Sequence, residues 1–329
     1  MKIALIGATG LVGTEMIKVL EEFHIPFNEF IPAASERSVG KTLTFKGQPY
    51  KVVSIAEAME ANPSVAIFSA GAGVSLQWAR EFASRGCFVI DNSSAWRMYD
   101  DVPLVVPEVN AHALSRETKV IANPNCSTIQ LVVALAPLHR AFGIKRLVIA
   151  TYQSVTGTGA KAVQQMEDER AGISGEKAYP YPIDLNCFPH GGSFAEDGYT
   201  TEELKLLHEG RKILEAPELK VTATVVRIPV IGGHSEAVNI ELHRPFDLQQ
   251  VRIMLEQAPG VVVQDDPARN IYPMPLTSHQ KNEVFVGRIR RDSTVENGLN
   301  LWIVADNLRK GAATNAVQIA QLLHKKGWV

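Results

Sequence analysis

The sequence predicts an α/β protein: an N-terminal domain built on a parallel sheet, then a second α/β domain with a mixed or antiparallel sheet. Three observations support this prediction. A short apolar run leads into a glycine-rich turn at the N-terminus, short apolar runs alternate with helical patterns as far as residue 126, and longer strand-like runs follow. Strands that alternate with helices form parallel sheets with helices on both faces. The first domain is therefore expected to be of the Rossmann type.

The first part of the chain contains five short apolar runs that we interpret as buried strands. They are Lys2–Ile6, Glu29–Ala33, Val65–Ser69, Cys87–Ile90 and Lys119–Ala122. Apolar residues recur at helical spacing between them, as in Thr14–Phe23 and Val74–Arg85.

The pattern changes near residue 126, where an apolar helix, Ser127–Ala141, is expected to begin. The longer strands expected after it are Ile144–Ser154, Val221–Val230, Ala237–Leu242, Glu283–Asp292 and Gly298–Ala305. A stretch rich in Pro, Gly and Tyr, Gly172–Gly198, is interpreted as an excursion at a subunit interface. The amphipathic segment Ala312–Lys325 is expected to return to the first domain. The expected domains are residues 1–126 completed by 308–329, and residues 127–307.

Composition excludes several classes of protein. The 329 residues carry a net charge of −2 and no run of like charges, which argues against nucleic acid or an anionic membrane as a partner. Three scattered cysteines form neither a disulfide framework nor a metal cluster, and a reducing cytoplasm is the expected compartment. We expect no metal, no signal peptide and no membrane span, because no apolar run is long enough to cross a bilayer.

The N-terminal turn has the pattern of a phosphate-binding loop. Gly7, Gly10 and Gly13 follow a strand and open a helix, in the spacing GxxGxxG. The first glycine permits the sharp turn, the second lets a pyrophosphate approach the backbone, and the third lets helix and strand pack closely. The N–H groups at the helix N-terminus favour an anion. A dinucleotide cofactor is therefore expected, although a tight turn without a ligand would show the same pattern.

The end of the second expected strand selects the cofactor. An NAD enzyme usually has an acid there that binds the ribose 2′-hydroxyl. In this chain Arg37 lies between Ser35 and Ser38, and an arginine with neighbouring hydroxyls suits the 2′-phosphate of NADP. Glu36 is the competing signal, because it could act as the ribose-binding acid.

Cys126 is the candidate nucleophile. It lies between an expected strand and an expected apolar helix, and the dipole at a helix N-terminus favours a thiolate. A thiolate can attack an aldehyde, and loss of hydride from the adduct leaves a thioester. The commoner state of a lone cysteine is a small buried apolar residue. We assign that state to Cys87 and Cys187.

His234 and Arg227 are the candidate partners of the cysteine. His234 follows a glycine pair, where the backbone permits close approach of a substrate, and a histidine can take the thiol proton and return it. Arg227 could hold a carboxylate in a bidentate grip. Taken singly, a residue of either type is more often structural than catalytic.

Several segments resemble the aspartate-semialdehyde dehydrogenase family. They occur in the family's order over nearly the whole chain, and they are GATGLVG, SERSVGK, NSSAWRM, NPNCST, YQSVTGTG, RIPVIGGHSE and DNLRKGAA. The resemblance implies an NADPH-dependent, phosphate-releasing reduction of aspartyl phosphate to aspartate semialdehyde. It also implies a homodimer formed through the second domain, and a place in lysine, threonine, methionine and diaminopimelate synthesis.

The resemblance further implies a role for individual residues. Cys126 matches the nucleophile, His234 the acid/base, Asn125 its companion beside the nucleophile, and Gln153 the residue that positions the substrate. Arg227 matches the residue that binds the substrate carboxylate, and Glu202 matches the one that contacts the substrate amino group. The phosphate-binding residues of the family are matched by Arg97 and Lys205. NADP contacts are matched by Thr9, Gly10, Leu11, Val12, Arg37, Ser38, Thr156, Gly157 and Asn307.

Two rival functions remain beside this one. An N-acetyl-glutamyl-phosphate reductase has a similar architecture and the same thioester chemistry, but the RIPV…GHSE segment with Glu202 and Lys205 favours a free amino acid. A non-catalytic NADP-binding sensor would lack the cysteine, histidine or arginine, and all three are present. Dimer and tetramer are both compatible with the sequence.

Overall fold

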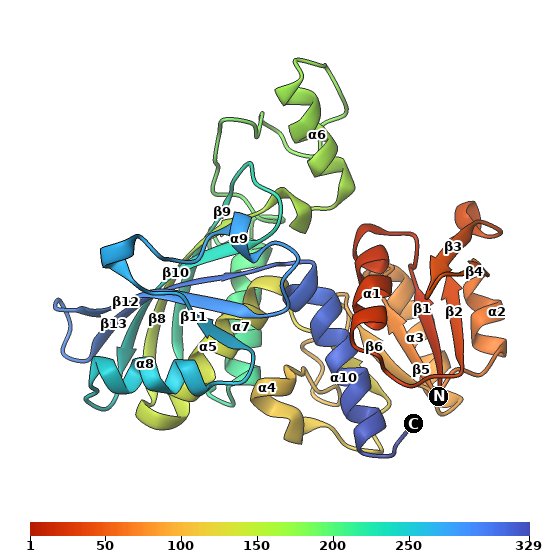
Figure 1. Cartoon of the computed structure of the whole chain (residues 1–329), viewed down its shortest axis with the longest axis horizontal. Coiled ribbons are helices and arrows are strands. Elements are labelled where there is room, and N and C mark those ends of the chain that lie inside the picture. Colours follow the sequence, from red (N-terminus) through yellow and green to blue (C-terminus); the bar gives the residue numbers. More distant parts are fainter. The chain divides into compact units, whose positions relative to one another are not determined.

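The computed structural model describes residues 1–329 and divides into two compact units (Figure 1). Unit 1 comprises Met1–Asn125 and Ala312–Val329, and unit 2 comprises Cys126–Gly311. Cys126 is thus the first residue of unit 2, whereas the sequence had placed it at the end of the first domain. None of the helices combines the length and the apolar character that a membrane crossing requires.

Unit 1 contains the predicted parallel sheet. Its strand order is β2-β1-β5-β6-β7, and every neighbouring pair is parallel. The strands are β1 (Lys2–Ile6), β2 (Glu29–Ala33), β5 (Val65–Phe68), β6 (Phe88–Asp91) and β7 (Val120–Ala122). The chain leaves β1 toward β2 and returns to β5 on the other side of β1. This reversal puts the glycine turn, which follows β1, at the switch point where such sheets bind ligands.

Helices and one small hairpin complete unit 1. They are α1 (Leu11–Glu22), α2 (Ile55–Glu60), α3 (Ala72–Ser84), α4 (Pro107–Asn110) and α10 (Thr314–Lys325), with short 3-10 turns η1 (Glu36–Ser38) and η2 (Ala111–Ala113) and the hairpin β3 (Thr42–Phe45) and β4 (Gln48–Lys51). The core joins Ile3 and Leu5 of β1 to Met16 of α1 and Ile319 of α10, all completely buried. The predicted C-terminal helix therefore packs on the first sheet's core, and the hairpin was not predicted.

Unit 2 contains a six-stranded mixed sheet in the order β11-β12-β13-β10-β8-β9. Its strands are β8 (Ile144–Gln153), β9 (Lys220–Arg227), β10 (His234–Leu242), β11 (Val261–Val263), β12 (Val284–Asp292) and β13 (Gly298–Ala305). The outer pairs β8/β9 and β11/β12 are parallel and the inner pairs antiparallel, which confirms the predicted mixed sheet.

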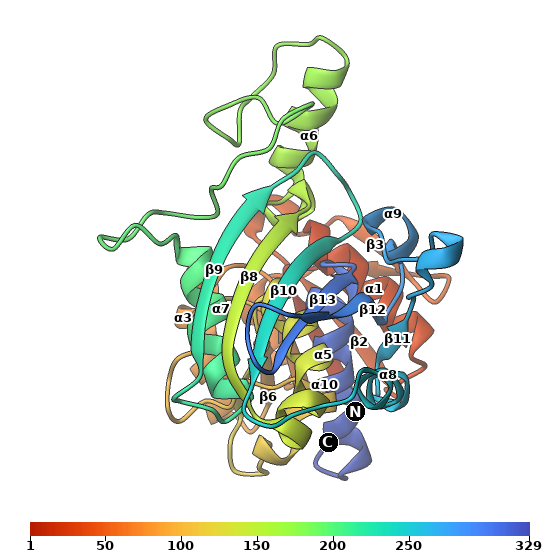
Figure 2. The same cartoon turned by 90° about the vertical axis from the view of Figure 1, so that its left-hand side faces the viewer.

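The helices of unit 2 are α5 (Cys126–Phe142), α6 (Ala160–Arg170), α7 (Thr201–Ile213), α8 (Leu248–Gln257) and α9 (Pro275–Ser278), with short turns η3 (Val155–Gly157) and η4 (Pro267–Arg269) and the π-helical turn η5 (Arg309–Ala313). Helix α5 packs against both α7 and α8, and the three contact the sheet. Figure 2 shows β9, β8 and β10 side by side with no helix in front of them. Tyr152 and Trp302 pack together in the sheet, with ring centroids 5.5 Å apart.

Several strand boundaries differ from those expected, and two of the differences affect the candidate site. β9 ends at Arg227 rather than Val230, and Pro229, which has no N–H to donate to a sheet, lies in the gap before the next strand. β10 begins at His234 rather than Ala237, because His234 already pairs with Ala305 of β13. The histidine is therefore held by a strand. No helix or strand forms between α6 and α7, where the excursion was expected.

Candidate active site

The glycine turn has the geometry that a bound pyrophosphate needs. Gly7 has φ +92°, and a Cβ there would lie 2.4 Å from the Ser69 carbonyl oxygen. A Cβ on Gly13 would lie 2.2 Å from the Gly7 carbonyl oxygen. The space around Gly10, the N-cap of α1, is less crowded: a Cβ placed there would meet only the Gly7 carbonyl oxygen, at 3.4 Å. No side chain caps the N-terminus of α1. The Gly10 N–H donates to the Gly7 carbonyl oxygen at 3.0 Å, so the backbone N–H groups of Leu11 and Val12, in the first turn of α1, are the ones left to receive an anion.

The segment after β2, which is expected to discriminate between NADP and NAD, lies beside this turn. β1 and β2 are parallel and end together, with Ile6 opposite Ala33. This pairing brings η1 next to the glycine turn, where the Thr9 hydroxyl donates to Ser38 Oγ at 3.3 Å. Arg37 is exposed, and Lys41 Nζ donates to Ser38 Oγ at 3.5 Å. Lys41 is a second cation near Ser38 that the sequence analysis did not single out.

Three residues predicted for the second domain meet at one edge of its sheet. Gln153 ends β8 and Arg227 ends β9, and these are register partners in a parallel pair. His234 begins β10, which runs antiparallel to β8, so the start of β10 lies beside the end of β8. All three side chains are buried. Residues far apart in sequence are therefore brought together by strand direction alone.

The cysteine reaches the same edge through its helix. Cys126 is the first residue of α5 and is half-buried, and Gln153 Nε2 donates to Oγ of the adjacent Ser127. A Cβ on Gly311 would lie 2.9 Å from Cys126 Cβ, so the π-helical turn η5 packs directly on Cys126. Asn125 immediately precedes the helix and is buried.

The other two cysteines differ from Cys126 in environment. Burial raises the pKa of the Cys87 thiol to about 12, which suppresses its thiolate. Cys187 is exposed. Of the three, only Cys126 combines partial exposure with a position at the start of a long helix.

The imidazole of His234 is held from one side and open on the other. The backbone N–H of Ser154 donates to Nδ1 at 3.0 Å, whereas Nε2 is buried and has no hydrogen-bond partner. Burial, followed by the charge of Arg227, lowers the pKa of His234 to about 3. A Cβ on Gly157 would lie 3.1 Å from His234 Nε2 and 3.0 Å from Arg227 Nη1. Glycine at this position therefore leaves room beside both groups.

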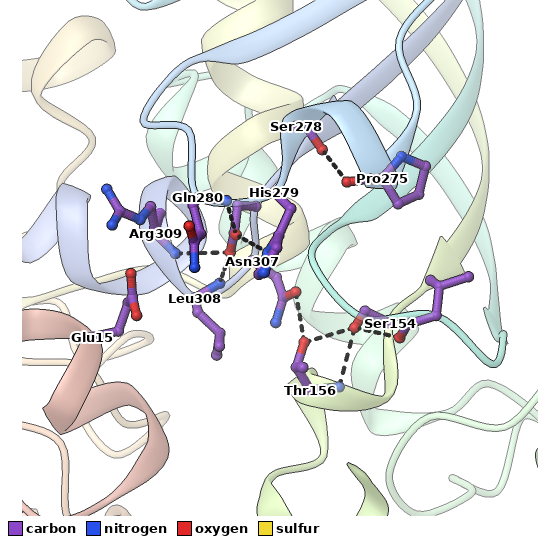
Figure 3. Close-up of polar contacts among 12 residues, drawn as sticks. Glu15, Ser154, Thr156, Pro275, Ser278, His279, Gln280, Asn307, Leu308 and Arg309 are labelled. Carbon is purple, nitrogen blue, oxygen red and sulfur yellow. Dashed lines mark hydrogen bonds and ion pairs between the residues drawn. The ribbon is translucent and has the colours of Figure 1, made fainter. Parts of the chain in front are cut away.

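A hydrogen-bonded chain supports this edge (Figure 3). Thr156 Oγ1 donates to Asn307 Oδ1 at 2.9 Å, and the hydroxyls of Ser154 and Thr156 are 2.7 Å apart. Ser154 Oγ donates to the Val230 carbonyl oxygen at 2.8 Å. Thr156, Gly157 and Asn307, which the resemblance assigned to NADP, thus surround the backbone that holds His234.

Glu202 and Lys205 form an ion pair of 2.7 Å, one helical turn apart on α7. Thr200 and Glu203 begin this helix with a capping box, and Glu203 Oε1 also accepts from the backbone N–H of Val225 in β9. The Glu203 side chain therefore has a structural role at the start of α7. Such a helix cap typically contributes about 0.5–2 kcal/mol to the stability of the folded protein. Glu202 contributes to the electrostatic environment of His234, raising its pKa against the larger opposing effects.

Arg97 is the one expected phosphate binder that belongs to unit 1. It is buried and its Nη2 donates to the Asn92 carbonyl oxygen at 3.1 Å. Besides Lys41, the sequence analysis did not single out Gln130, Ser154 and Gly311. Gln130 lies one turn into α5, a spacing that could have suggested it, and its Nε2 donates to the His234 carbonyl oxygen at 3.2 Å. Ser154 contacts the His234 ring through its backbone N–H, and Gly311 contacts Cys126 by having no side chain, so neither contact has a side-chain signal in the sequence.

Two family models match the chain. The model described as "Semialdehyde dehydrogenase, NAD binding domain" matches residues 2–117, and "Semialdehyde dehydrogenase, dimerisation domain" matches residues 135–310. The chain accordingly has the domains of a nicotinamide-dependent semialdehyde dehydrogenase.

Individual proteins with similar sequences and structures identify the family within this class of enzymes. The chain is 51% identical to aspartate-semialdehyde dehydrogenase of Aquifex aeolicus, over 100% of this chain and 99% of that one. It is 47% identical to the Legionella pneumophila enzyme, over 99% and 96%. The crystal structure of aspartate semialdehyde dehydrogenase II from Vibrio cholerae, also solved with ASA, superposes with a TM-score of 0.94 at 44% identity, covering 98% of each chain. The chain belongs to the aspartate-semialdehyde dehydrogenase family.

Proposed function

We propose that the chain reduces L-aspartyl 4-phosphate to L-aspartate 4-semialdehyde with NADPH, releasing phosphate through a thioester on Cys126. The observation that carries this proposal is the pair formed by Arg227 Nη1 and His234 Nε2, which both border Gly157. A cation suited to a carboxylate thus lies next to a ring nitrogen suited to a carbonyl oxygen, at the sheet edge that α5 reaches through Ser127. A short amino acid with a reactive carbonyl fits this pair.

NADP is the proposed cofactor. The turn Gly7–Gly13 would hold its pyrophosphate, because Gly10 leaves the backbone open there. Ser35, Arg37, Ser38 and Lys41 would surround the 2′-phosphate, since cations and hydroxyls suit that group better than Glu36 does. When bound, the cofactor supplies the hydride that reduces the acyl group. The Candida albicans structure described as containing NADP, with a TM-score of 0.78 at 26% identity, supports the choice.

The chain's own residues would bind and activate the acyl phosphate. The Cys126 thiolate attacks its carbonyl carbon, favoured by the dipole of α5. Arg227 grips the substrate carboxylate, Glu202 the amino group, and Gln153 with Asn125 orients the reacting carbonyl. Lys205 and Arg97 bind the phosphate. His234 serves the carbonyl oxygen.

The protein is further proposed to act as a homodimer through unit 2, in the synthesis of lysine, threonine, methionine and diaminopimelate. The match of residues 135–310 to a dimerisation-domain model supports the dimer. Sedimentation at micromolar concentration should give about twice the chain mass of 36.0 kDa. A monomer alone would contradict this part of the proposal, and a tetramer would require a second interface.

A spectrophotometric assay tests the function. Aspartate semialdehyde with NADP should yield reduced nicotinamide only when phosphate is present, because phosphate is needed to cleave the thioester. Replacing Lys205 or Arg97 with Ala should raise the KM for phosphate with little effect on the KM for NADP. Turnover without phosphate would contradict the acylating mechanism. Preference for N-acetylglutamate semialdehyde would favour the rival reductase, and binding of NADP without any turnover would favour the sensor.

A further inference from the structure

Asp306 is a buried carboxylate that the proposed mechanism does not use. It directly follows Ala305, the last residue of β13, which pairs with His234 of β10. Its side chain is only 2% exposed, and donors from two separate segments of the chain surround it. Such donors offset the loss of hydration that a buried carboxylate suffers. The residues that supply them show which part of the molecule Asp306 holds in place.

One carboxylate oxygen organises the turn that follows Asp306. Oδ1 accepts from the backbone N–H groups of Leu308 at 2.9 Å and of Arg309 at 3.2 Å. The backbone carbonyl oxygen of Asp306 accepts from the N–H of Gly311 at 3.1 Å. Residues 306–311 thus form one turn, and all three of these bonds end on Asp306.

The other carboxylate oxygen ties this turn to the segment after α9. Oδ2 accepts from the backbone N–H of Gln280 at 2.8 Å and lies 3.0 Å from Nδ1 of His279 (Figure 3). Gln280 has φ +59°, a left-handed conformation that a residue other than glycine keeps only where its surroundings hold it. The His279 ring lies against Gly232, where a Cβ would come within 2.6 Å of it. The carboxylate therefore connects the turn to the segment packed on the glycine pair before His234.

The turn held by Asp306 carries two residues of the candidate site. Asn307 is buried, and its Oδ1 accepts from Thr156 Oγ1 at 2.9 Å. Thr156 precedes Gly157, whose vacant Cβ position borders Arg227 and His234. At the other end of the turn, Gly311 packs on Cys126. A movement of the turn would therefore displace Asn307 and the residue packed on Cys126 together.

We propose that Asp306 is a positioning residue: its carboxylate fixes the turn 306–311, so that Asn307 meets the nicotinamide end of the cofactor and Gly311 supports Cys126. The nicotinamide end is the part concerned, because Asn307 and Thr156 lie next to the groups that would hold the reacting carbonyl. This inference rests on the proposed function, since Asn307 acts through the bound cofactor. Asp306 acts indirectly, through the backbone of the turn.

Calorimetric titration with cofactors tests the proposal without any turnover. Asp306→Ala removes all the side-chain contacts and should raise the Kd for NADP about tenfold, the effect of one hydrogen bond. The Kd for NAD should rise by the same factor, because both cofactors share the nicotinamide end and the proposed 2′-phosphate site belongs to unit 1. Asp306→Asn keeps an acceptor for Leu308 and Arg309 but places an amide group opposite the Gln280 N–H. Its Kd for both cofactors should therefore be intermediate.

Asp247→Ala is the matched control for a purely structural role. Asp247 caps α8, where its Oδ1 accepts from the backbone N–H groups of Gln249 at 2.8 Å and Gln250 at 3.2 Å. Asp247→Ala and Asp306→Ala should both lower the melting temperature. Only Asp306→Ala should weaken cofactor binding and, with substrate present, lower kcat by about 10–10²-fold through displacement of the turn.

Wild-type Kd values for both cofactors in Asp306→Ala, with a loss of thermal stability like that of Asp247→Ala, would overturn the proposal. A rise in Kd confined to NADP would overturn it as well, because it would place the effect at the 2′-phosphate. If Asp306→Ala does not fold, Asp306→Asn decides by the same comparison. Failure of the proposed function is a separate result: the wild-type protein would bind the cofactor but not turn over aspartate semialdehyde.

Discussion

Gly311 packs against Cys126 so closely that a Cβ at residue 311 would lie 2.9 Å from Cys126 Cβ and 3.2 Å from its Cα. Neither neighbour is the end of a flexible side chain, so Gly311→Ala has to move the start of α5 or the turn η5. Displacing a nucleophile by about 1 Å can cost about 10²-fold in rate. We therefore expect Gly311→Ala to lower kcat by about 10–10²-fold, measured by steady-state kinetics with aspartate semialdehyde.

Gly210→Ala is the matched control for this substitution. Gly210 lies inside α7, and a Cβ there would have no atom within 4 Å. The control should retain kcat, and it should be slightly more stable because alanine is the better helix former. If Gly311→Ala were as active as Gly210→Ala, the packing of η5 would have no influence on the nucleophile.

Cys126→Ala should abolish turnover and leave NADP binding nearly unchanged. The thiol is the only proposed covalent group, so activity should fall by more than about 10³-fold. The glycine turn belongs to unit 1 and does not depend on the thiol. Calorimetric titration with NADP measures binding, and the exposed Cys187→Ala serves as the active control. A tenth of the wild-type rate in Cys126→Ala would refute its role as nucleophile.

Arg37→Ala should raise the KM for NADP far more than the KM for NAD, because only NADP carries the 2′-phosphate. Lys41→Ala should have the same selective effect, since its ammonium contacts Ser38 Oγ at 3.5 Å. The exposed Lys51→Ala provides a charge-matched control in unit 1. Equal changes for both cofactors would mean that Arg37 and Lys41 are surface charges without a role in selection.

Features encoded by neighbouring residues could be predicted from the sequence. The glycine turn, β1, β2 and β13 needed only local patterns, and Cys126 stood out as a cysteine before an apolar helix. The contact between Ser154 and His234 could not be predicted, since it joins residues 80 positions apart through a backbone N–H. The start of β10 at His234 depends likewise on pairing with β13. Such contacts depend on the register of distant strands, which no local pattern reports.

Glu236 is two residues beyond His234 in β10 and is completely buried, and neither carboxyl oxygen accepts a hydrogen bond. The Gln130 side chain lies close enough to lower the pKa of Glu236, although by less than burial raises it. A completely buried carboxyl group whose oxygens accept no hydrogen bond is favoured in its neutral form, because burial penalises the charge. Burial raises the pKa of Glu236 well above its usual 4.5, in agreement with a neutral acid.

Glu236→Gln should therefore stabilise the protein increasingly as the pH rises. The folded chain keeps a proton on Glu236 that the unfolded chain releases above its pKa of about 4.5. The contribution of this acid is fully present below that value and is lost toward the higher folded pKa, by up to about 1.4 kcal/mol per pH unit. Glutamine does not titrate, and its side chain is close in size and shape to the neutral carboxyl group. Urea denaturation at about pH 5.5 and about pH 8.5 should show a gain for Glu236→Gln that grows with pH. The exposed Glu218→Gln should show no such growth, and a gain independent of pH in Glu236→Gln would mean that Glu236 is ionised in the folded protein.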